Sequence, residues 1–316
     1  DESIFSATLP ERPGSVFAGW SQVFVPYCSG DMWLGADRHR RILGQLQMSG
    51  HLILDTVLEH ISNTTEFSTK SREVVFSGSS AGGVGVIQHA DWFRQKLDTL
   101  HIASRMVVLP LAGLFFPKGY PILFPEFAVG RPQVLDGFMA RYCHMVERGF
   151  LHEGCLEALN GTHQANGTCF DVSKVLPHVK TPLFLIQNQF DRLQIHDLGL
   201  CPPKACSIRT KPSSLGGHFI NYLGNRTNIT LKEMALEFPQ VGLFIPSYFD
   251  HDRSLRYEVA GRGQGIRGLS FKSAFYAWYH HHKLLHVFAS TCDGGPCGGC
   301  PEPQEVDFRE GATLLV

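Results

Sequence analysis

Four short stretches of the chain are almost continuously apolar, which is unusual for strands that face water on one side. They lie at Gln22–Tyr27, Glu73–Gly78, Ala103–Leu111 and Pro182–Gln187. Segments of helical length separate them along the chain. Buried strands that alternate with helices are typical of a parallel sheet covered on both faces. The pattern therefore predicts an α/β fold with a doubly wound, mostly parallel sheet.

A helical pattern follows the second apolar stretch. After Gly83, the apolar residues Val86, Ala90, Phe93 and Leu97 recur at intervals of three or four, and polar residues at positions 88, 91, 94 and 95 fill the opposite side. This periodicity predicts one amphipathic helix. A strand, a turn rich in Gly and Ser, and a helix are thus expected in that order.

The rest of the chain is expected to add to one domain. Residues 127–180 are rich in polar residues, cysteine and glycosylation sequons, and we expect helices and excursions that cap the sheet. The tail from Cys292 is a compact stretch of cysteine and glycine. With 316 residues and 43% hydrophobic side chains, the sequence can form a single α/β domain spanning residues 1–316.

Charge and hydropathy exclude several classes of partner. The chain has 28 basic and 29 acidic residues and no basic stripe, so we expect no nucleic-acid partner. Its longest apolar run, Met106–Phe116, is interrupted by Pro110 and is much shorter than the roughly 20 residues that span a bilayer. We therefore expect no membrane span.

Cysteines and sequons point to an oxidising compartment. The chain has nine cysteines, and its Asn-x-Thr sequons lie at Asn63, Asn160, Asn166, Asn225 and Asn228. Together they predict a secreted, extracellular glycoprotein with disulfide bonds. The sequence opens with Asp1 and has no signal peptide, so we expect a processed form or an N-terminally incomplete chain.

The turn Gly78-Ser79-Ser80-Ala81-Gly82 matches the pattern G-x-S-x-G, with Ser80 in the middle. A nucleophile on a sharp strand-to-helix turn requires neighbours without side chains, and the helix N-terminus favours developing negative charge. A phosphate-binding or dinucleotide-binding turn is the alternative, but the expected lysine and the G-x-G-x-x-G spacing are missing. The motif therefore favours Ser80 as a nucleophile.

A serine nucleophile needs a base and an acid, in the chain order Ser, Asp or Glu, then His. Asp191 follows the last apolar stretch, where the acid is expected, although an Asp there is also a common turn former. Among 16 histidines, His218 and His251 remain as candidates for the base, and spacing does not decide between them. The run His280–His282 indicates a surface, because three adjacent side chains cannot face one metal.

The sequence resembles the Notum and pectin acetylesterase family of serine carboxylesterases. The resemblance is carried by segments at Val23–Ala36, Val74–Val86, Pro182–Gln194, Ser247–Leu255 and the closing "CDGGPCGGCP". It implies an α/β-hydrolase-like fold, with Ser80 as nucleophile, Asp191 as the orienting acid and His251, not His218, as the base. It also implies a disulfide-closed excursion between Cys155 and Cys169, structural bridges from Cys292, Cys297 and Cys300, and neither a cofactor nor a metal.

Two departures from the family pattern bear on catalysis. The family's oxyanion hole combines the amide after the serine, here that of Ala81, with a Gly-rich loop upstream, which we expect to be missing from this chain. In addition, residues 111–114 read Leu-Ala-Gly-Leu where the family tends to have Asp, a small residue, Gly and an aromatic residue. Either the pocket wall is more apolar than in a sugar-acetate esterase, or Leu111 is a core residue.

The resemblance implies a carboxylesterase that removes an O-linked acyl group through an acyl-serine intermediate. The segment "YCSGDMW" favours the Notum branch, which acts on a palmitoleoyl ester of Wnt proteins. A pectin or polysaccharide O-acetylesterase is the alternative. A catalytically impaired relative that binds ligands is a second alternative. The expected substrate is accordingly an acylated protein or an acetylated polysaccharide.

Overall fold

A computed structural model describes the chain in two compact units. The described residues are 17, 20–37, 41–42, 46–64, 67, 73–102, 105–115, 149–160, 168–197, 206–207, 210–211, 213–238, 241–259, 265–281, 285–289 and 311–315. One unit contains residues 19–113, 138–183 and 309–316, and the other contains residues 1–18, 114–137 and 184–308. We call them the serine unit and the histidine unit, after Ser80 and His251. That all 316 residues form a single domain stays a prediction.

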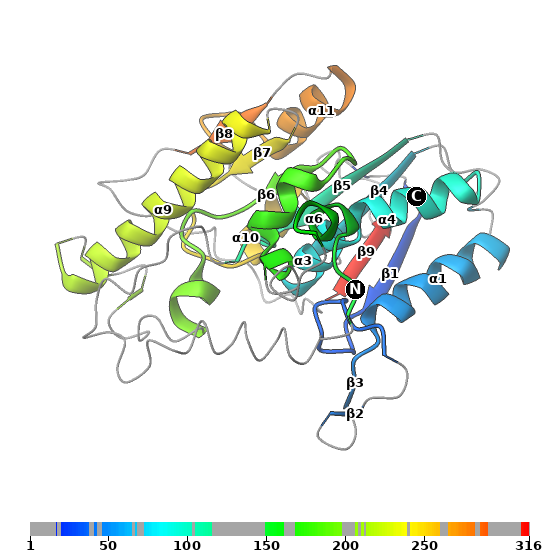
Figure 1. The fold of residues 1–316 in the computed structure, drawn as a ribbon. Coiled ribbons are helices and arrows are strands. Elements are labelled where there is room, and N and C mark those ends of the chain that lie inside the picture. The colour runs from blue at the N-terminus through cyan, green and yellow to red at the C-terminus, as the bar shows by residue number, and fades with distance from the viewer. Residues whose placement is uncertain are drawn as a thin grey trace. The chain divides into compact units, whose positions relative to one another are not determined.

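The serine unit is built on a four-stranded part of a sheet (Figure 1). Its strands lie in the order β1, β9, β4, β5, with bounds Gln22–Pro26, Gly311–Leu315, Glu73–Ser79 and Arg105–Leu111. The parallel pair β4 and β5 runs in register from Glu73 opposite Arg105 to Ser79 opposite Leu111. After its first residue each of these strands is buried throughout, as their continuous apolar sequences predict.

The first apolar stretch takes a different place from the one expected. Strand β1 pairs antiparallel with β9, and β9 pairs antiparallel with β4. Most of β1 is exposed or partly exposed, and Phe24 alone leaves 42% of its surface open. The prediction that this stretch is a buried parallel strand is therefore wrong, because the strand beside it comes from the far end of the chain. A short hairpin of β2 (Arg41–Ile42) and β3 (Leu46–Gln47) stands apart.

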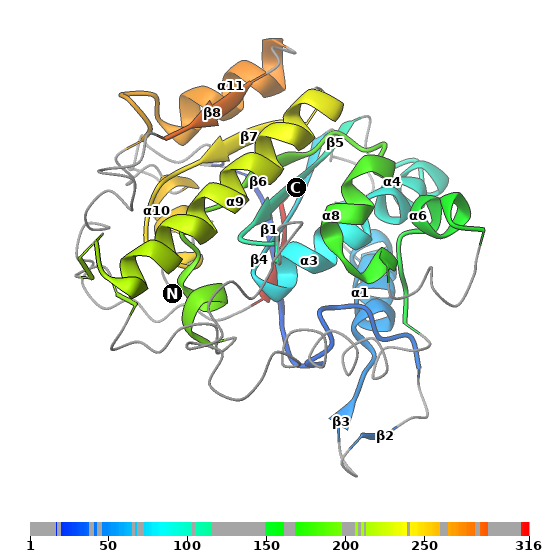
Figure 2. The same ribbon diagram turned by 60° about the vertical axis from the view of Figure 1, so that its left-hand side comes forward.

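The helix predicted after Gly83 is two helices. Helix α3 (Ala81–Gln88) packs on β9, β4 and β5 (Figure 2), and α4 (Ala90–Thr99) continues after a break at His89. The His89 ring is fully buried and shares a short hydrogen bond of 2.8 Å with the Gly85 carbonyl. At the break, the His89 side chain thus binds a backbone carbonyl four residues earlier in the same chain. Gln88, which the pattern placed on the polar side, is completely buried.

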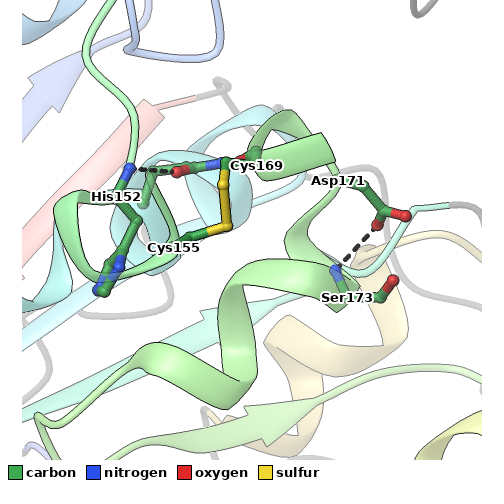
Figure 3. The surroundings of a disulfide bond; sticks show 6 residues. His152, Cys155, Cys169, Asp171 and Ser173 are labelled. Atoms are coloured by element: carbon green, nitrogen blue, oxygen red, sulfur yellow. Dashed lines mark hydrogen bonds between the residues drawn. A yellow bond between two sulfur atoms is a disulfide. The ribbon is translucent and has the colours of Figure 1, made fainter. Parts of the chain in front are cut away.

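The remaining helices of the serine unit are short, apart from α1. Their bounds are Gly50–Thr64 for α1, Glu153–Ala158 for α6, Val172–Val175 for α8 and Leu176–His178 for the 3₁₀ turn η1. The Asp171 side chain caps α8 by accepting from the Ser173 amide (Figure 3). The expected helical excursion is therefore present in the described part of residues 127–180.

A disulfide joins Cys155 of α6 to Cys169, as the resemblance implied (Figure 3). Gln88 fixes this excursion to α3: its Nε2 donates to the Cys169 carbonyl at 2.7 Å, and its Oε1 accepts from the His152 amide at 3.0 Å. A buried amide that satisfies two backbone groups explains why Gln88 is inside. The predicted bridges of Cys292, Cys297 and Cys300 lie outside the described residues.

The histidine unit contains three parallel strands and the longest of the described helices. The strands are β6 (Phe184–Ile186), β7 (Gly242–Ile245) and β8 (His286–Phe288), with β7 between the other two. The helices are α9 (Leu215–Glu237), α10 (Arg253–Val259) and α11 (Phe271–His281), and a π-helical turn η2 spans Leu193–Asp197. Phe184 of β6 meets the rings of Phe271 and Phe275, both on α11, edge to face.

Three of the predicted sequons present exposed asparagines: Asn63, Asn160 and Asn225. Asn228 is partly buried on α9, and Asn166 lies outside the described residues. Throughout the part of the chain that the structure describes, no helix has the length and apolarity needed to cross a membrane.

Candidate active site

Ser80 stands at the sharp turn between β4 and α3. Its backbone adopts φ 58° and ψ −119°, a conformation that is strained for any residue other than glycine. The Ser80 amide donates to the Leu111 carbonyl at the end of β5, at 2.9 Å. This bond holds the turn at the carboxyl end of the parallel strands, where residues of α/β proteins act on ligands.

The glycines around Ser80 are required by close packing. A β-carbon on Gly78 would lie 2.3 Å from the Gly82 carbonyl oxygen, and one on Gly83 would lie 2.7 Å from the Leu111 oxygen. The steric reason predicted for the motif is therefore present in the structure. Ala81 is the first residue of α3, so its amide is among the helix amides that have no acceptor within the helix.

A buried carboxylate, Asp31, positions the residue whose ring packs against α3. Asp31 is completely buried and accepts hydrogen bonds from the amides of Trp33, Gly35 and Gly50, at 3.0, 3.0 and 2.7 Å. It thereby holds Trp33, at φ 69°, in a left-handed conformation that costs energy outside glycine. A β-carbon on Gly85 of α3 would lie 2.8 Å from the Trp33 ring. Asp31 lies in the segment Val23–Ala36 that carries the family resemblance, but its supporting role was not predicted.

Asp191 lies in the histidine unit, after β6, with only 2% of its surface exposed. Its carboxylate accepts from the Leu193 amide at 2.9 Å and from the side-chain amides of Gln187 and Gln194 at 3.3 Å each. Gln187 and Gln194 also bind the Leu114 amide and carbonyl, at 3.1 and 3.0 Å. These glutamines were missed, although "QNQFDRLQ" places five amide and carboxylate side chains after one strand.

His251 faces this carboxylate. Its Nδ1 lies 2.9 Å from both oxygens of Asp191. Because a carboxylate only accepts, Nδ1 carries the proton, and Nε2 of the neutral ring is left as an acceptor. Burial disfavours the charged ring, but the charge and hydrogen bond of Asp191, with the charges of Asp252 and Asp250, raise the pKa of His251 from 6.5 to about 9.

The structure brings Asp191 and His251 together and leaves the other histidine candidates apart. His218 lies exposed on the first turn of α9, and His280 is exposed on α11. No group of His, Cys, Asp and Glu side chains in the described ranges is arranged to hold a metal ion.

An aromatic ring lies beside His251. The ring centroid of Phe115 lies 5.9 Å from that of His251, and Leu114 is almost fully buried. In the serine unit, Leu111 is completely buried as the last residue of β5, which agrees with its interpretation as a core residue.

Comparison with known proteins places this chain in a family. A sequence profile described as Pectinacetylesterase matches residues 2–295. The chain belongs to the pectinacetylesterase family. The resemblance found in the sequence is thereby confirmed.

The relatives of this family member include palmitoleoyl-protein carboxylesterases and a pectin acetylesterase. A palmitoleoyl-protein carboxylesterase NOTUM from Schmidtea mediterranea is 38% identical over 254 residues, which are 77% of this chain and 42% of that protein. The human protein of the same name is 24% identical over 303 residues, covering 89% of this chain and 52% of that protein. Pectin acetylesterase 5 from Arabidopsis thaliana is 24% identical over 207 residues, covering 65% and 44%. The chain thus spans about half the length of these relatives.

A solved structure confirms the fold class. The Wnt deacylase Notum from Drosophila matches with a TM-score of 0.62 at 22% identity, covering 84% of this family member and 69% of the solved chain. The predicted α/β fold of the hydrolase type is therefore correct.

Proposed function

We propose that this chain carries the catalytic machinery of a serine carboxylesterase that removes an O-linked acyl group. The observation that supports it most is the contact of 2.9 Å between His251 Nδ1 and each oxygen of Asp191. A carboxylate that orients a histidine is the arrangement that activates a serine. Membership of the pectinacetylesterase family and the strained turn at Ser80 agree with it.

In the proposed reaction the Ser80 hydroxyl attacks the ester carbonyl and gives its proton to Nε2 of His251. The Ala81 amide donates to the oxyanion of the tetrahedral intermediate. His251 then returns the proton to the leaving alcohol, which forms acyl-Ser80. Water attacks this ester by the same route, releases the carboxylic acid and restores Ser80. Asp191 fixes the histidine tautomer and stabilises the imidazolium.

We further propose a long acyl chain as the substrate group, as on the palmitoleoyl proteins after which the Notum relatives are named. The aromatic ring of Phe115, which lies next to that of His251, supports this choice. Apolar walls bind acyl chains by removing them from water. Secretion is part of the proposal, supported by the Cys155–Cys169 disulfide and the three exposed sequon asparagines.

The test compares hydrolysis of p-nitrophenyl acetate and p-nitrophenyl octanoate by the chain and by Ser80→Ala. We expect Ser80→Ala to lose more than about 10³-fold in kcat/KM. Ser79→Ala, one residue away and equally buried, is the matched control and should keep its activity. If the chain shows no turnover that depends on Ser80, the enzyme proposal fails and a ligand-binding role takes its place.

Covalent labelling of Ser80 by a fluorophosphonate tests which of the two histidines is the base. His251→Gln should abolish labelling of Ser80, and His218→Gln should leave it unchanged, because His218 lies exposed on α9. The opposite result would transfer the role of base to His218.

A second candidate is removal of acetyl groups from a polysaccharide. The family description and the pectin acetylesterase of Arabidopsis favour it. Under this candidate the acetate ester is cleaved and the octanoate ester is not, whereas the long-chain proposal predicts preference for octanoate.

A further inference from the structure

Three consecutive amide side chains, Gln187, Asn188 and Gln189, follow β6 and are completely buried. Burying an amide is unfavourable unless its hydrogen bonds are replaced. Three such residues in a row, just before Asp191, therefore indicate specific partners. Gln187 donates to Asp191 itself, as described above, and the other two hold different parts of the backbone.

Asn188 binds the loop that carries His251. Its Nδ2 donates to the carbonyls of Asp250 and His251, at 3.1 and 3.0 Å, and to the Ser254 hydroxyl at 2.8 Å. Residues 250–252 form no helix or strand. A residue on such a segment depends on side-chain contacts for its position, because no regular ladder fixes its backbone.

Gln189 has the same chemistry and a different target. Its Nε2 donates to the Ala289 and Ile245 carbonyls, at 3.0 and 3.4 Å, at the ends of β8 and β7. In both residues the side-chain carbonyl oxygen is buried without a hydrogen-bond partner among the described residues. Replacement of either amide thus removes the same kind of bonds, but only Asn188 contacts the backbone of His251.

We propose that Asn188 is a positioning residue for the Asp191–His251 pair, which it serves by fixing the main chain of His251 from the segment that carries Asp191. The inference rests on the proposed function, in which these two residues are the acid and the base. Asn188 and Asp191 are three positions apart in the segment that follows β6, so this one segment contacts both the backbone and the ring of the histidine. A displacement of about 1 Å in such a constellation lowers rates by about 10²-fold.

The experiment compares Asn188→Ala with Gln189→Ala in the whole chain, with thermal unfolding to establish how much of each is folded. For p-nitrophenyl octanoate we expect Asn188→Ala to lower kcat at least tenfold with KM within twofold. Gln189→Ala should change both by less than twofold. Asn188→Ser is measured beside them because it changes the buried volume less.

A second readout follows the protonation of His251 without any turnover. In chains with ¹³C-labelled histidine, assigned with His251→Gln, we expect the Asn188 variants to lower the pKa of His251 by about one unit, because its contact with Asp191 loosens. Gln189→Ala should leave this titration unchanged.

The outcomes separate this inference from the proposed function. If the unaltered chain has no turnover that depends on Ser80, the proposed function fails, and the His251 titration still tests Asn188. Equal losses in the Asn188 and Gln189 variants, or an unchanged His251 titration, would overturn the inference. So would failure of both Asn188 variants to fold while Gln189→Ala folds, because Asn188 would then serve the fold alone.

Discussion

At the scale of single residues, the geometry around Asp191 decides how His251 must lie. The carboxylate accepts from the Leu193 amide and from two glutamine side chains, which fixes its plane. The histidine ring then meets both oxygens at equal distances of 2.9 Å. The orientation of the proposed base is therefore set before any substrate binds.

The raised pKa of His251 predicts an alkaline pH profile for ester hydrolysis. Only the neutral ring accepts the serine proton, so kcat/KM should rise with pH, with a midpoint above the ordinary value of 6.5 and towards about 9. Asp191→Asn should shift this midpoint downward and lower kcat by about 10⁴-fold. Initial rates from about pH 5 to about pH 10 test this. A midpoint at or below 6.5 in the unaltered chain would contradict it.

Much of the candidate site could be read from the sequence, and the reasons are local. The glycines around Ser80 indicate a tightly packed turn from the sequence alone. Asp191 follows a strand that was recognisable from its apolar residues. His251 could not be separated from His218 by spacing, because the contact with Asp191 spans 60 positions and is made by a loop. Asn188 and Gln189 were missed because a buried amide has no periodic signature in a sequence.

At the scale of elements, the Gln88 side chain attaches the excursion closed by Cys155 and Cys169 to α3. Gln88 satisfies the His152 amide and the Cys169 carbonyl together. The helical periodicity extended across His89 without a gap, and it therefore predicted one helix with Gln88 on the outside. Because the apolar residues keep their helical spacing on both sides of His89, the sequence does not show that the helix ends there. At this position the His89 ring binds the Gly85 carbonyl.

Removing the disulfide should destabilise this excursion by a predictable amount. The bridge joins positions 14 apart, and closing a loop of that length contributes about 3 kcal/mol. We expect the double variant Cys155→Ser, Cys169→Ser to lose about that much free energy of unfolding in urea. Cys28 is free and exposed, so Cys28→Ser is the control and should change stability by less than about 0.5 kcal/mol. Equal effects of the two changes would contradict a structural bridge.

At the scale of the whole molecule, folding shifts the pKa values of two histidines in opposite directions. Burial, aided by the charge of His51, lowers the pKa of His89 from 6.5 to about 3. His89 therefore stays neutral in the folded chain while it gains a proton in the unfolded chain, and stability is lost as the pH falls below 6.5. For His251 the raised pKa means that its contribution is complete below 6.5 and is lost as the pH rises towards 9.

The contributions of these two histidines to thermal stability are therefore greatest together near pH 6.5, where the loss from His89 begins on acidification and the loss from His251 begins on alkalinisation. Between about pH 7 and about pH 5, His89 should cost about 2 kcal/mol of the free energy of unfolding. His89→Gln should be less stable at neutral pH but should lose less on acidification. The measurement is thermal unfolding of both chains across this range. A steeper loss in His89→Gln than in the unaltered chain would contradict the neutral, buried state of His89.

The order of strands in the serine unit has a consequence for how the chain is made. Strand β9 lies between β1 and β4, although Gly311–Leu315 comes more than two hundred residues after both of them. A ribosome releases the chain from its N-terminus, so β4 and β5 can pair early, while β1 must wait until Leu315 has left the exit tunnel. Until then the edge of β4 carries unpaired backbone groups that other chains could occupy. This part of the sheet is therefore completed only after more than two hundred residues beyond β4 have been made.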